Sequence, residues 1–305
     1  MKLSGFFRFF SFLFVSAILT GFVANNFSYA QSYSVSASSA PAGALSTSTE
    51  EITICTGGPL GRYAQYGKLL SERLSKNYTI IVVNTQGSVE NAEKLADGTC
   101  DFAIMQHDVA KHVPGIAHLA RLFDEYPHMI CNHNLVPSVD SIGDLADFPG
   151  TIAVAVGGER SGSRATFLNL ANLDNDYGKS NFDPVSLDTL EGVAMLIGGN
   201  LQCLWFVSGI GPEYMELIDR YKKILFMVEV NDSSFNDTGE YAFAKIPKDA
   251  YVLTKSWWGD YDTFAVHSDL YGREDLMLRK PKGYLAVKSV AMPVAIELQN
   301  VMGVK

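Results

Sequence analysis

The sequence predicts an α/β protein of two domains, each with a parallel sheet covered by helices on both faces. Short apolar runs with the composition of strands alternate with segments whose apolar residues recur at helical spacing. This rhythm begins at Glu51, starts again at Thr151, and extends over around 100 residues each time. Such alternation is typical of parallel sheets between two helical layers. We expect residues 51–135 and 260–305 to form the first domain and residues 136–259 the second.

The first run contains three strands, and a helical pattern follows each of the first two. The expected elements are strands at 51–56, 78–84 and 101–106 and helices at 60–74 and 89–97. Two further apolar segments follow, at 117–122 and 128–132.

The second run repeats this pattern and leads into a less regular tail. The expected elements are strands at 151–157, 201–207 and 224–230 and helices at 161–173, 187–199 and 212–223. In the tail we expect extended segments at 251–253 and 263–266. A final helix should run from Lys288 to Val301, with Pro293 in its first turns.

The first thirty residues have the layout of a secretory signal peptide. A basic start and an apolar stretch at 9–24 precede a small-x-small cleavage site at residues 28–30. An uncleaved anchor is the alternative, because this mostly apolar stretch of 16 residues approaches the length that spans a bilayer. Residues 31–50 are rich in Ser and Ala and are expected to form a flexible leader.

The charge balance of the mature chain is acidic. Removal of the leader takes away two basic residues and leaves 22 basic against 33 acidic side chains, a net charge of −11. Nucleic acid is therefore not an expected partner, because its affinity depends on basic contacts to phosphates. No later segment is long and apolar enough to span a bilayer. We expect a soluble, exported chain.

The four cysteines carry no metal-site signature, because no CxxC pair is present. Cys55 falls late in one expected strand and Cys100 just before another. In parallel strands these positions lie at opposite ends, too far apart for a disulfide. We expect these two residues, with Cys131 and Cys203, to be small buried hydrophobic residues.

The connections after the strands share one composition. Five of them read CTGGPLGRY, NTQGSVEN, MQHDVA, VGGERSGS and FVSGIGP, and all but one are rich in Gly, Ser, Thr or Asn. Ligands of open α/β sheets bind outside the carboxyl ends of the strands, where helix N-termini suit an anion. Three loops belong to the first domain and two to the second, which predicts an interdomain cleft for a small carboxylate. The alternative is that these residues are ordinary caps and turns.

Other chemistries lack their motifs. The chain has no GxxxxGK[ST], GxGxxG, GxSxG or HExxH pattern. His107 and His112 are five residues apart and so do not share a helix face. Asp108 could serve as a general base or as a helix cap. We expect no catalytic residue, no metal and no cofactor.

At these loops the chain resembles the TAXI-type solute-binding subunits of TRAP transporters, the periplasmic partners of sodium-coupled permeases. ITICTGGPLGRYAQYG resembles the family's opening strand, its TGGP loop and its tyrosine, and GSVEN joined to QHDVA at the correct spacing is the most specific match. VAVGGERSGSRAT and IGGNLQCLWFVSG match later segments. The resemblance covers roughly residues 52–218, with a weaker match to about residue 270.

The resemblance implies a type II periplasmic-binding-protein-like fold whose two α/β domains close around glutamate, a related amino acid or a dicarboxylate. Tyr63 and Phe206 would form an apolar or stacking wall. The contacts implied by position are Gly57, Gly58, Tyr63, Ser88, Asn91, Gln106, Asp108, Ser161, Gly162, Ser163 and Phe206.

Four residues depart from the family pattern. Arg62, Arg160 and Arg164 place three cations at or beside the expected cleft, and His107 replaces a small residue. Arginine binds carboxylates in bidentate fashion, so Arg62 is a candidate ligand contact that would favour two carboxylates. The alternative, that the side chain points into solvent, stays open for Arg62 and is favoured for Arg164.

The expected function is a periplasmic binding protein that captures a small organic anion and delivers it to TRAP permease subunits. A sensor module with the same fold and site is one alternative. A periplasmic enzyme that uses Asp108 or His107 as a base is the other.

Overall fold

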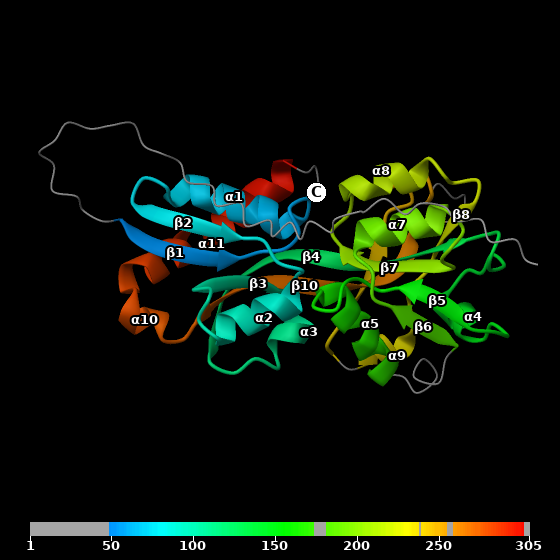
Figure 1. The fold of residues 1–305 in the computed structure, drawn as a ribbon, viewed down its shortest axis with the longest axis horizontal. Helices are drawn as coiled ribbons and strands as arrows, with labels where there is room; N and C mark the ends of the chain where they lie inside the picture. The colour runs from blue at the N-terminus through cyan, green and yellow to red at the C-terminus, as the bar shows by residue number, and fades with distance from the viewer. Residues whose placement is uncertain (1–48, 174–180, 238, 255–258, 302–305) are drawn as a thin grey trace, which may run out of the picture. The chain divides into compact units, whose positions relative to one another are not determined.

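The computed structural model describes residues 49–173, 181–237, 239–254 and 259–301 (Figure 1). The expected signal peptide and residues 31–48 of the expected leader lie outside the described residues. The described strands form one sheet of ten strands, with helices on both of its faces (Figure 1).

The strands and helices have the following limits. The strands are β1 (Glu50–Cys55), β2 (Tyr78–Val83), β3 (Phe102–Gln106), β4 (Ile116–Asn132), β5 (Ile152–Ala155), β6 (Phe182–Val185), β7 (Cys203–Ser208), β8 (Leu225–Val228), β9 (Ala242–Ile246) and β10 (Tyr261–Arg273). The helices are α1 (Arg62–Leu74), α2 (Ser88–Ala96), α3 (His107–Ala110), α4 (Ile142–Ala146), α5 (Gly162–Leu173), α7 (Thr189–Ile197), α8 (Glu213–Asp219), α9 (Ser233–Asp237), α10 (Leu276–Arg279) and α11 (Pro281–Val301).

The sheet is mixed, so the expectation of purely parallel sheets is wrong. Its main path is β2-β1-β3-β10-β4-β7-β5-β6, while β8 pairs with β4 and β9 with β10. The pairs β1–β2, β1–β3, β5–β6 and β5–β7 are parallel, as βαβ units require. Pairs that include β4 or β10 are antiparallel. These two strands join the halves of the sheet.

Strand β3, at the centre of the first half, is buried on both faces. In β3, Phe102 and Ile104 point into the core under α1 and α11. Ala103 and Met105 point to the opposite core under α2 and α3. This alternation follows from the period of two in a strand and explains why the run is apolar throughout.

The second half is built in the same way around β7. Trp205 and Val207 belong to a core with α5 and α9, whereas Leu204 and Phe206 pack in another core against α7 and α8. Trp205 and Phe206 are almost completely buried.

The two apolar segments expected at 117–122 and 128–132 are parts of one long strand, β4. Its first part, to Glu125, pairs with β10, and its second part, from Tyr126, pairs with β7. In β10, residues up to Ala265 pair with β9, and residues from Val266 onward pair with β4. The chain therefore passes between the halves of the sheet within β4 and returns within β10.

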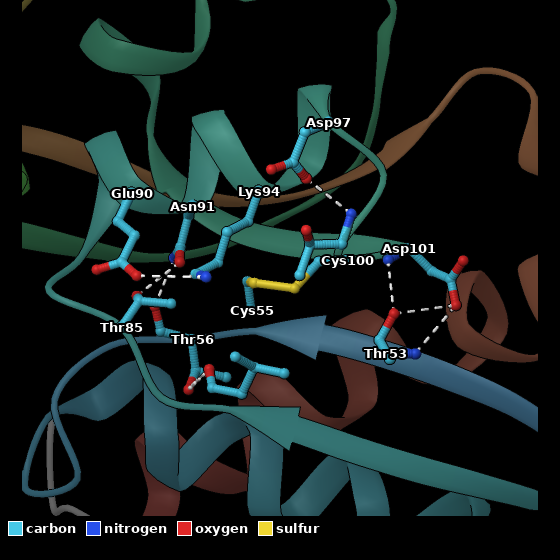
Figure 2. Close-up of a disulfide and its surroundings, with 12 residues drawn as sticks. Thr53, Cys55, Thr56, Thr85, Glu90, Asn91, Lys94, Asp97, Cys100 and Asp101 are labelled. Carbon is cyan, nitrogen blue, oxygen red and sulfur yellow. Dashed lines mark hydrogen bonds and ion pairs between the residues drawn. A yellow bond between two sulfur atoms is a disulfide. The ribbon is translucent and has the colours of Figure 1, made fainter. Parts of the chain in front are cut away.

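The structure contains two disulfides, Cys55–Cys100 and Cys131–Cys203, so the expectation of four unpaired cysteines is wrong. The error lies in the stagger of the strands. Cys55, at the end of β1, pairs with Ala103 near the start of β3, and Cys100 lies three residues before Ala103. The two Cα atoms are 5.9 Å apart, within the range for a disulfide (Figure 2).

The tail differs from expectation: β9 and α10 were not expected, and β10 extends well beyond residues 263–266 on both sides. The last helix begins at Pro281 rather than Lys288, because proline is favourable in a first turn, and Pro293 lies in the helix interior. Residues 251–253 form no strand. The N–H groups of Val252 and Leu253 donate instead to the Asp219 carboxylate, each at 2.9 Å.

Candidate functional site

Loops from the two halves of the sheet meet at the starts of α2 and α5. The backbone N–H of Glu90, in the first turn of α2, donates to the carbonyl of Arg160 at 3.1 Å. The N–H of Arg160 donates in return to Oε1 of Gln86 at 3.3 Å. These bonds join the loop after β2 to the loop after β5, which the sequence had placed in different runs.

Gly162 is the point of closest approach. A Cβ atom at this position would lie 1.9 Å from Oε1 of Gln106 and 2.7 Å from Oγ of Ser88. Ser88 Oγ also accepts a hydrogen bond of 3.0 Å from the N–H of Gln106. The first turn of α5 thus lies directly against the end of β3 and the start of α2, and a side chain at position 162 would force Gln106 and Ser88 to move.

A buried acid, Glu125, lies at the centre of a polar cluster where β4 and β10 run side by side. Its Oε2 accepts hydrogen bonds from Tyr63 at 2.9 Å and Ser268 at 2.6 Å, and a long one from Gln106 at 3.5 Å. We call these four residues the Glu125 cluster. All four are buried.

The electrostatics of the Glu125 cluster follow from its burial. Burial raises the pKa of Glu125 to about 6, against the lowering effects of its two hydroxyl donors and of Arg62. Burial and the neighbouring Glu125 also raise the pKa of Tyr63, which therefore stays a hydrogen-bond donor at neutral pH. Tyr63, which we expected to form an aromatic wall, thus has its hydroxyl held by polar partners.

Arg62 points inward rather than into solvent. Its Nη2 donates to the carbonyl of Ile210 at 2.7 Å, and its guanidinium lies flat against Gly209, in the loop after β7. The side chain also lies over the ring of Phe123, 5.9 Å from its centre. Burial lowers the pKa of Arg62, and Glu125 opposes that effect. Arg62 belongs to the first half of the sheet, and it thus places a buried positive charge against the second half.

Asp108 also connects the halves. Its Oδ2 accepts hydrogen bonds from Thr166 of α5 at 2.8 Å and from Tyr241 at 2.9 Å. Its other oxygen, Oδ1, is buried and has no hydrogen-bond partner among the described residues, and the same holds for Oε1 of Gln106. Gln106 and Asp108 are separated on the chain only by His107, and both face α5.

Other predicted contacts serve the fold itself. Asn91 accepts from Thr85 at 2.6 Å (Figure 2). It also donates to the carbonyl of Ile104 at 2.7 Å, so it ties α2 to the sheet. Ser163 accepts from the N–H of Val207 at 3.0 Å. Ser161 accepts from the N–H of Arg164 at 3.2 Å, as a helix cap does.

Phe206, Gly57 and Gly58 make no hydrogen bond to the acid of the Glu125 cluster among the described residues. Phe206 stacks on His128 with ring centres 4.6 Å apart, inside the core of the second half. Gly57 is buried beside the ring of Tyr63, and exposed Gly58 accepts from the N–H of Gly61 at 2.9 Å. Phe206 therefore packs the core under α7 and α8.

The other two arginines and His107 have partners of their own. Arg160 forms ion pairs with Glu90 and Glu93, and Arg164 lies 3.4 Å from Glu159. His107 contacts the carbonyl of Glu240 through Nε2 at 2.6 Å and accepts from the N–H of His267 at 3.1 Å through Nδ1.

Sequence reasoning missed Glu125, Ser268, Thr166 and Tyr241. Glu125 was overlooked because residues 123–127 lie between the two expected apolar segments. The acidic pair Asp124 and Glu125 inside this mostly apolar stretch was the available signal, since a buried acid needs specific partners.

The described residues contain no group of three or more acidic, His or Cys side chains that could hold a metal ion. Among the same residues, no helix is long and apolar enough to cross a membrane. One surface pocket, of about 350 Å³, lies beside β8 and contains none of the candidate residues. It is lined by His133, Lys222, Leu225, Phe226, Met227, Val252, Leu253 and Tyr261.

Solved structures with the same architecture hold small molecules. The chain is similar to PhnD1 from Prochlorococcus marinus in complex with methylphosphonate, with 12% identity, a TM-score of 0.55, and coverage of 84% of this chain and 90% of that one. It is also similar to the effector-binding domain of QuiR in complex with shikimate, with 13% identity, a TM-score of 0.50, and coverage of 82% and 99%. No curated protein sequence matches the chain.

The predicted α/β fold of periplasmic-binding-protein type is confirmed by these similarities. At such low identity they show the fold alone. The sequence profile of the NMT1-like family matches residues 54–288, more than half of the chain. The chain therefore belongs to the NMT1-like family.

Proposed function

We propose that this protein is a periplasmic solute-binding protein that captures a small amino acid and delivers it to TRAP-type permease subunits. The fold of small-molecule-binding proteins, the family match and the resemblance to TAXI-type subunits support this proposal. Export would follow from the signal peptide expected at residues 1–30. Binding, without catalysis, would be its whole activity.

The observation that carries the proposal is the pair of buried oxygen atoms without partners at the junction of the halves. Gln106 and Asp108 are at most 2% exposed, and one oxygen of each lacks a hydrogen bond among the described residues. An unsatisfied buried polar atom costs about 1–3 kcal/mol. A ligand with an ammonium group would supply the missing donors and offset that cost.

The same junction offers groups for a carboxylate. Arg62 supplies a buried guanidinium. The caps of α1 and α2, Gly61 and Gly87, bring no side chain to the first N–H groups of their helices, which favours an anion there. An amino acid such as glutamate has both kinds of group, whereas a dicarboxylate has no donor for Gln106 and Asp108. We therefore favour an amino acid over a dicarboxylate.

Capture would occur by closure of two domains, residues 51–135 with 260–305 and residues 136–259. The motion would bend β4 and β10, since these strands carry the chain between the halves. Gly162 would then approach Gln106 as the cleft closes, and the permease would recognise the closed form.

The test is a thermal-unfolding screen of protein refolded to remove carried ligand. The panel contains glutamate, glutamine, aspartate, 2-oxoglutarate, succinate and fumarate. A ligand at one hundred times its Kd adds about 2.7 kcal/mol, so a clear rise in Tm is expected with an amino acid. Asp108→Asn and Gln106→Leu should abolish that rise, whereas Lys245→Ala, an exposed residue of β9, should preserve it.

Two outcomes would contradict the proposal. A response to succinate and fumarate without one to any amino acid would exclude the role assigned to the two buried oxygens. A response to none of the six compounds would remove the carboxylate ligand altogether.

A further inference from the structure

The buried side of α11 fixes the orientation of this helix on the sheet. Seven residues of α11 are buried, mainly against α1 and β4, at positions that recur every three or four residues. They are Gly283, Tyr284, Val287, Ala291, Val294, Ala295 and Leu298. The opposite side of the helix must therefore face away from the protein.

That opposite side is apolar along its centre. Leu285, Met292 and Ile296 are 57%, 44% and 51% exposed. Spacings of seven and eleven residues bring these side chains within about 20° of one line along a helix of 3.6 residues per turn. Leu278 of the preceding α10 is 88% exposed and extends the apolar surface beyond the start of α11.

Two lysines border this apolar line. Lys282 and Lys288 are exposed and lie about 60° to either side of Leu285 by the same helical geometry. Neither lysine has an ion pair among the described residues, whereas the neighbouring Lys280 is bound to Asp101 and Arg279 to Asp275. We call Leu278, Lys282, Leu285, Lys288, Met292 and Ile296 the α11 outer face.

The charge of this segment is opposite to that of the chain. Residues 276–296 contain four basic and no acidic residues, whereas the chain as a whole has a net charge of −9. The acids at either end of the segment are neutralised, Asp275 by Arg273 and Glu297 by Arg73. The α11 outer face is thus a positive, apolar, convex surface on an acidic protein.

We propose that the α11 outer face rests on a membrane surface that contains anionic lipids. The apolar side chains would enter the boundary between headgroups and acyl chains, and Lys282 and Lys288 would face the headgroups. An exposed helical face that combines a basic border with Leu, Met and Ile is the composition of surface-bound helices. This inference is independent of the ligand and of the permease.

The experiment uses the absence of free thiols in the full chain, whose four cysteines are all paired. A single Leu285→Cys can be labelled with a polarity-sensitive fluorophore. The label should shift to the blue with vesicles that contain 30% phosphatidylglycerol and remain unchanged with pure phosphatidylcholine. The matched control is the same label on Leu190→Cys, an exposed leucine of α7, which should not shift.

Charge removal tests the role of the lysines. Lys282→Ala/Lys288→Ala should weaken the response of the Leu285→Cys label to anionic vesicles by about 25-fold in partition constant, roughly fivefold for each lysine. The label reports contact at α11 itself, so attachment of the chain through any other segment would not reproduce the shift.

Three results would overturn the proposal. They are no blue shift at Leu285→Cys with anionic vesicles, an equal shift with phosphatidylcholine, and a spectrum that is already blue-shifted without lipid and depends on protein concentration. The last result would indicate that a second copy of the chain covers this face. Circular dichroism and the ligand response of the variants establish that the fold is retained.

Discussion

At the scale of single residues, the candidate site is organised by a buried acid that the protein holds between two hydroxyl groups. Glu125 is fixed by Tyr63 and Ser268, one from α1 and the other from β10. Burial disfavours its charged form, so its pKa of about 6 lies close to neutral pH. The protonation state of Glu125 is therefore sensitive to any ligand charge that arrives nearby.

The raised pKa of Glu125 predicts a pH-dependent stability. Because its pKa is higher in the folded than in the unfolded state, the free energy of unfolding should fall as pH rises from about 4.5 to about 6, by about 2 kcal/mol. Glu125→Gln keeps an acceptor for both hydroxyl groups and removes this titration. Urea unfolding at pH 4, 5, 6 and 7 should show the variant gaining stability relative to the natural protein across that window.

The control for this prediction is Glu216→Gln, an exposed glutamate of α8, which should leave the profile of the natural protein unchanged. If Glu125→Gln were parallel to the natural protein at all four pH values, the buried acid would not titrate as described.

At the scale of elements, the strands are held by covalent links between neighbours. Cys131 and Cys203 join β4 to β7, where these residues pair directly across the sheet. The link closes a loop with a sequence separation of 72, so it restricts the unfolded chain strongly. Disulfides of this kind accord with a chain that folds outside the cytosol.

Removal of this link should destabilise the protein without changing its architecture. We expect Cys131→Ala/Cys203→Ala to lose about 2–5 kcal/mol in the free energy of unfolding. Urea unfolding measures the loss, and Cys55→Ala/Cys100→Ala provides the comparison for the other link. Detection of four reactive thiols in unreduced, denatured protein would show that neither disulfide exists.

The order of elements could be predicted from the sequence, since buried strands and amphipathic helices have distinct periods. The pairing of elements could not. The stagger that brings Cys55 next to Cys100 depends on how β3 shifts against β1, which no local pattern records. The start of α11 was missed because Pro281 was not recognised as a residue that favours a first turn.

For the same reason, some residues of the candidate site could be predicted from the sequence and others could not. Loop position placed Gln106, Gly162 and Ser88 at the ends of strands, and the structure brings them into contact. Glu125 belongs to the middle of a long strand, where loop position gives no signal. Asn91 lies at the correct place in the chain, but its amide is occupied by the backbone of the sheet.

At the scale of the whole molecule, the contact at Gly162 relates the two halves to each other. Its backbone lies against Gln106 and Ser88, which would have to move to accommodate a side chain. If closure captures the ligand, a side chain at position 162 would disfavour the closed form and lower its population.

Gly162→Ala should therefore hinder closure. The methyl group would overlap Gln106 Oε1, so we expect the affinity for the amino-acid ligand to fall about tenfold or more, with a small change in Tm of the free protein. Isothermal titration calorimetry measures the affinity, and Leu168→Ala on the exposed side of α5 is the control. Unchanged affinity in Gly162→Ala would show that binding does not require this contact.

The placement of the two disulfides has a mechanical consequence. Cys55–Cys100 lies within β1 to β3 and Cys131–Cys203 within β4 and β7, on the other side of the change of partners. Neither link ties the first half to the second, so oxidation stiffens each half and leaves β4 and β10 as the only described strands that run through both. If the proposed closure occurs, its bending would be concentrated in these two adjacent strands, next to a register shift between Ser268 and Asp269. In an oxidising compartment both disulfides would form, so each half would move more nearly as a rigid body during closure.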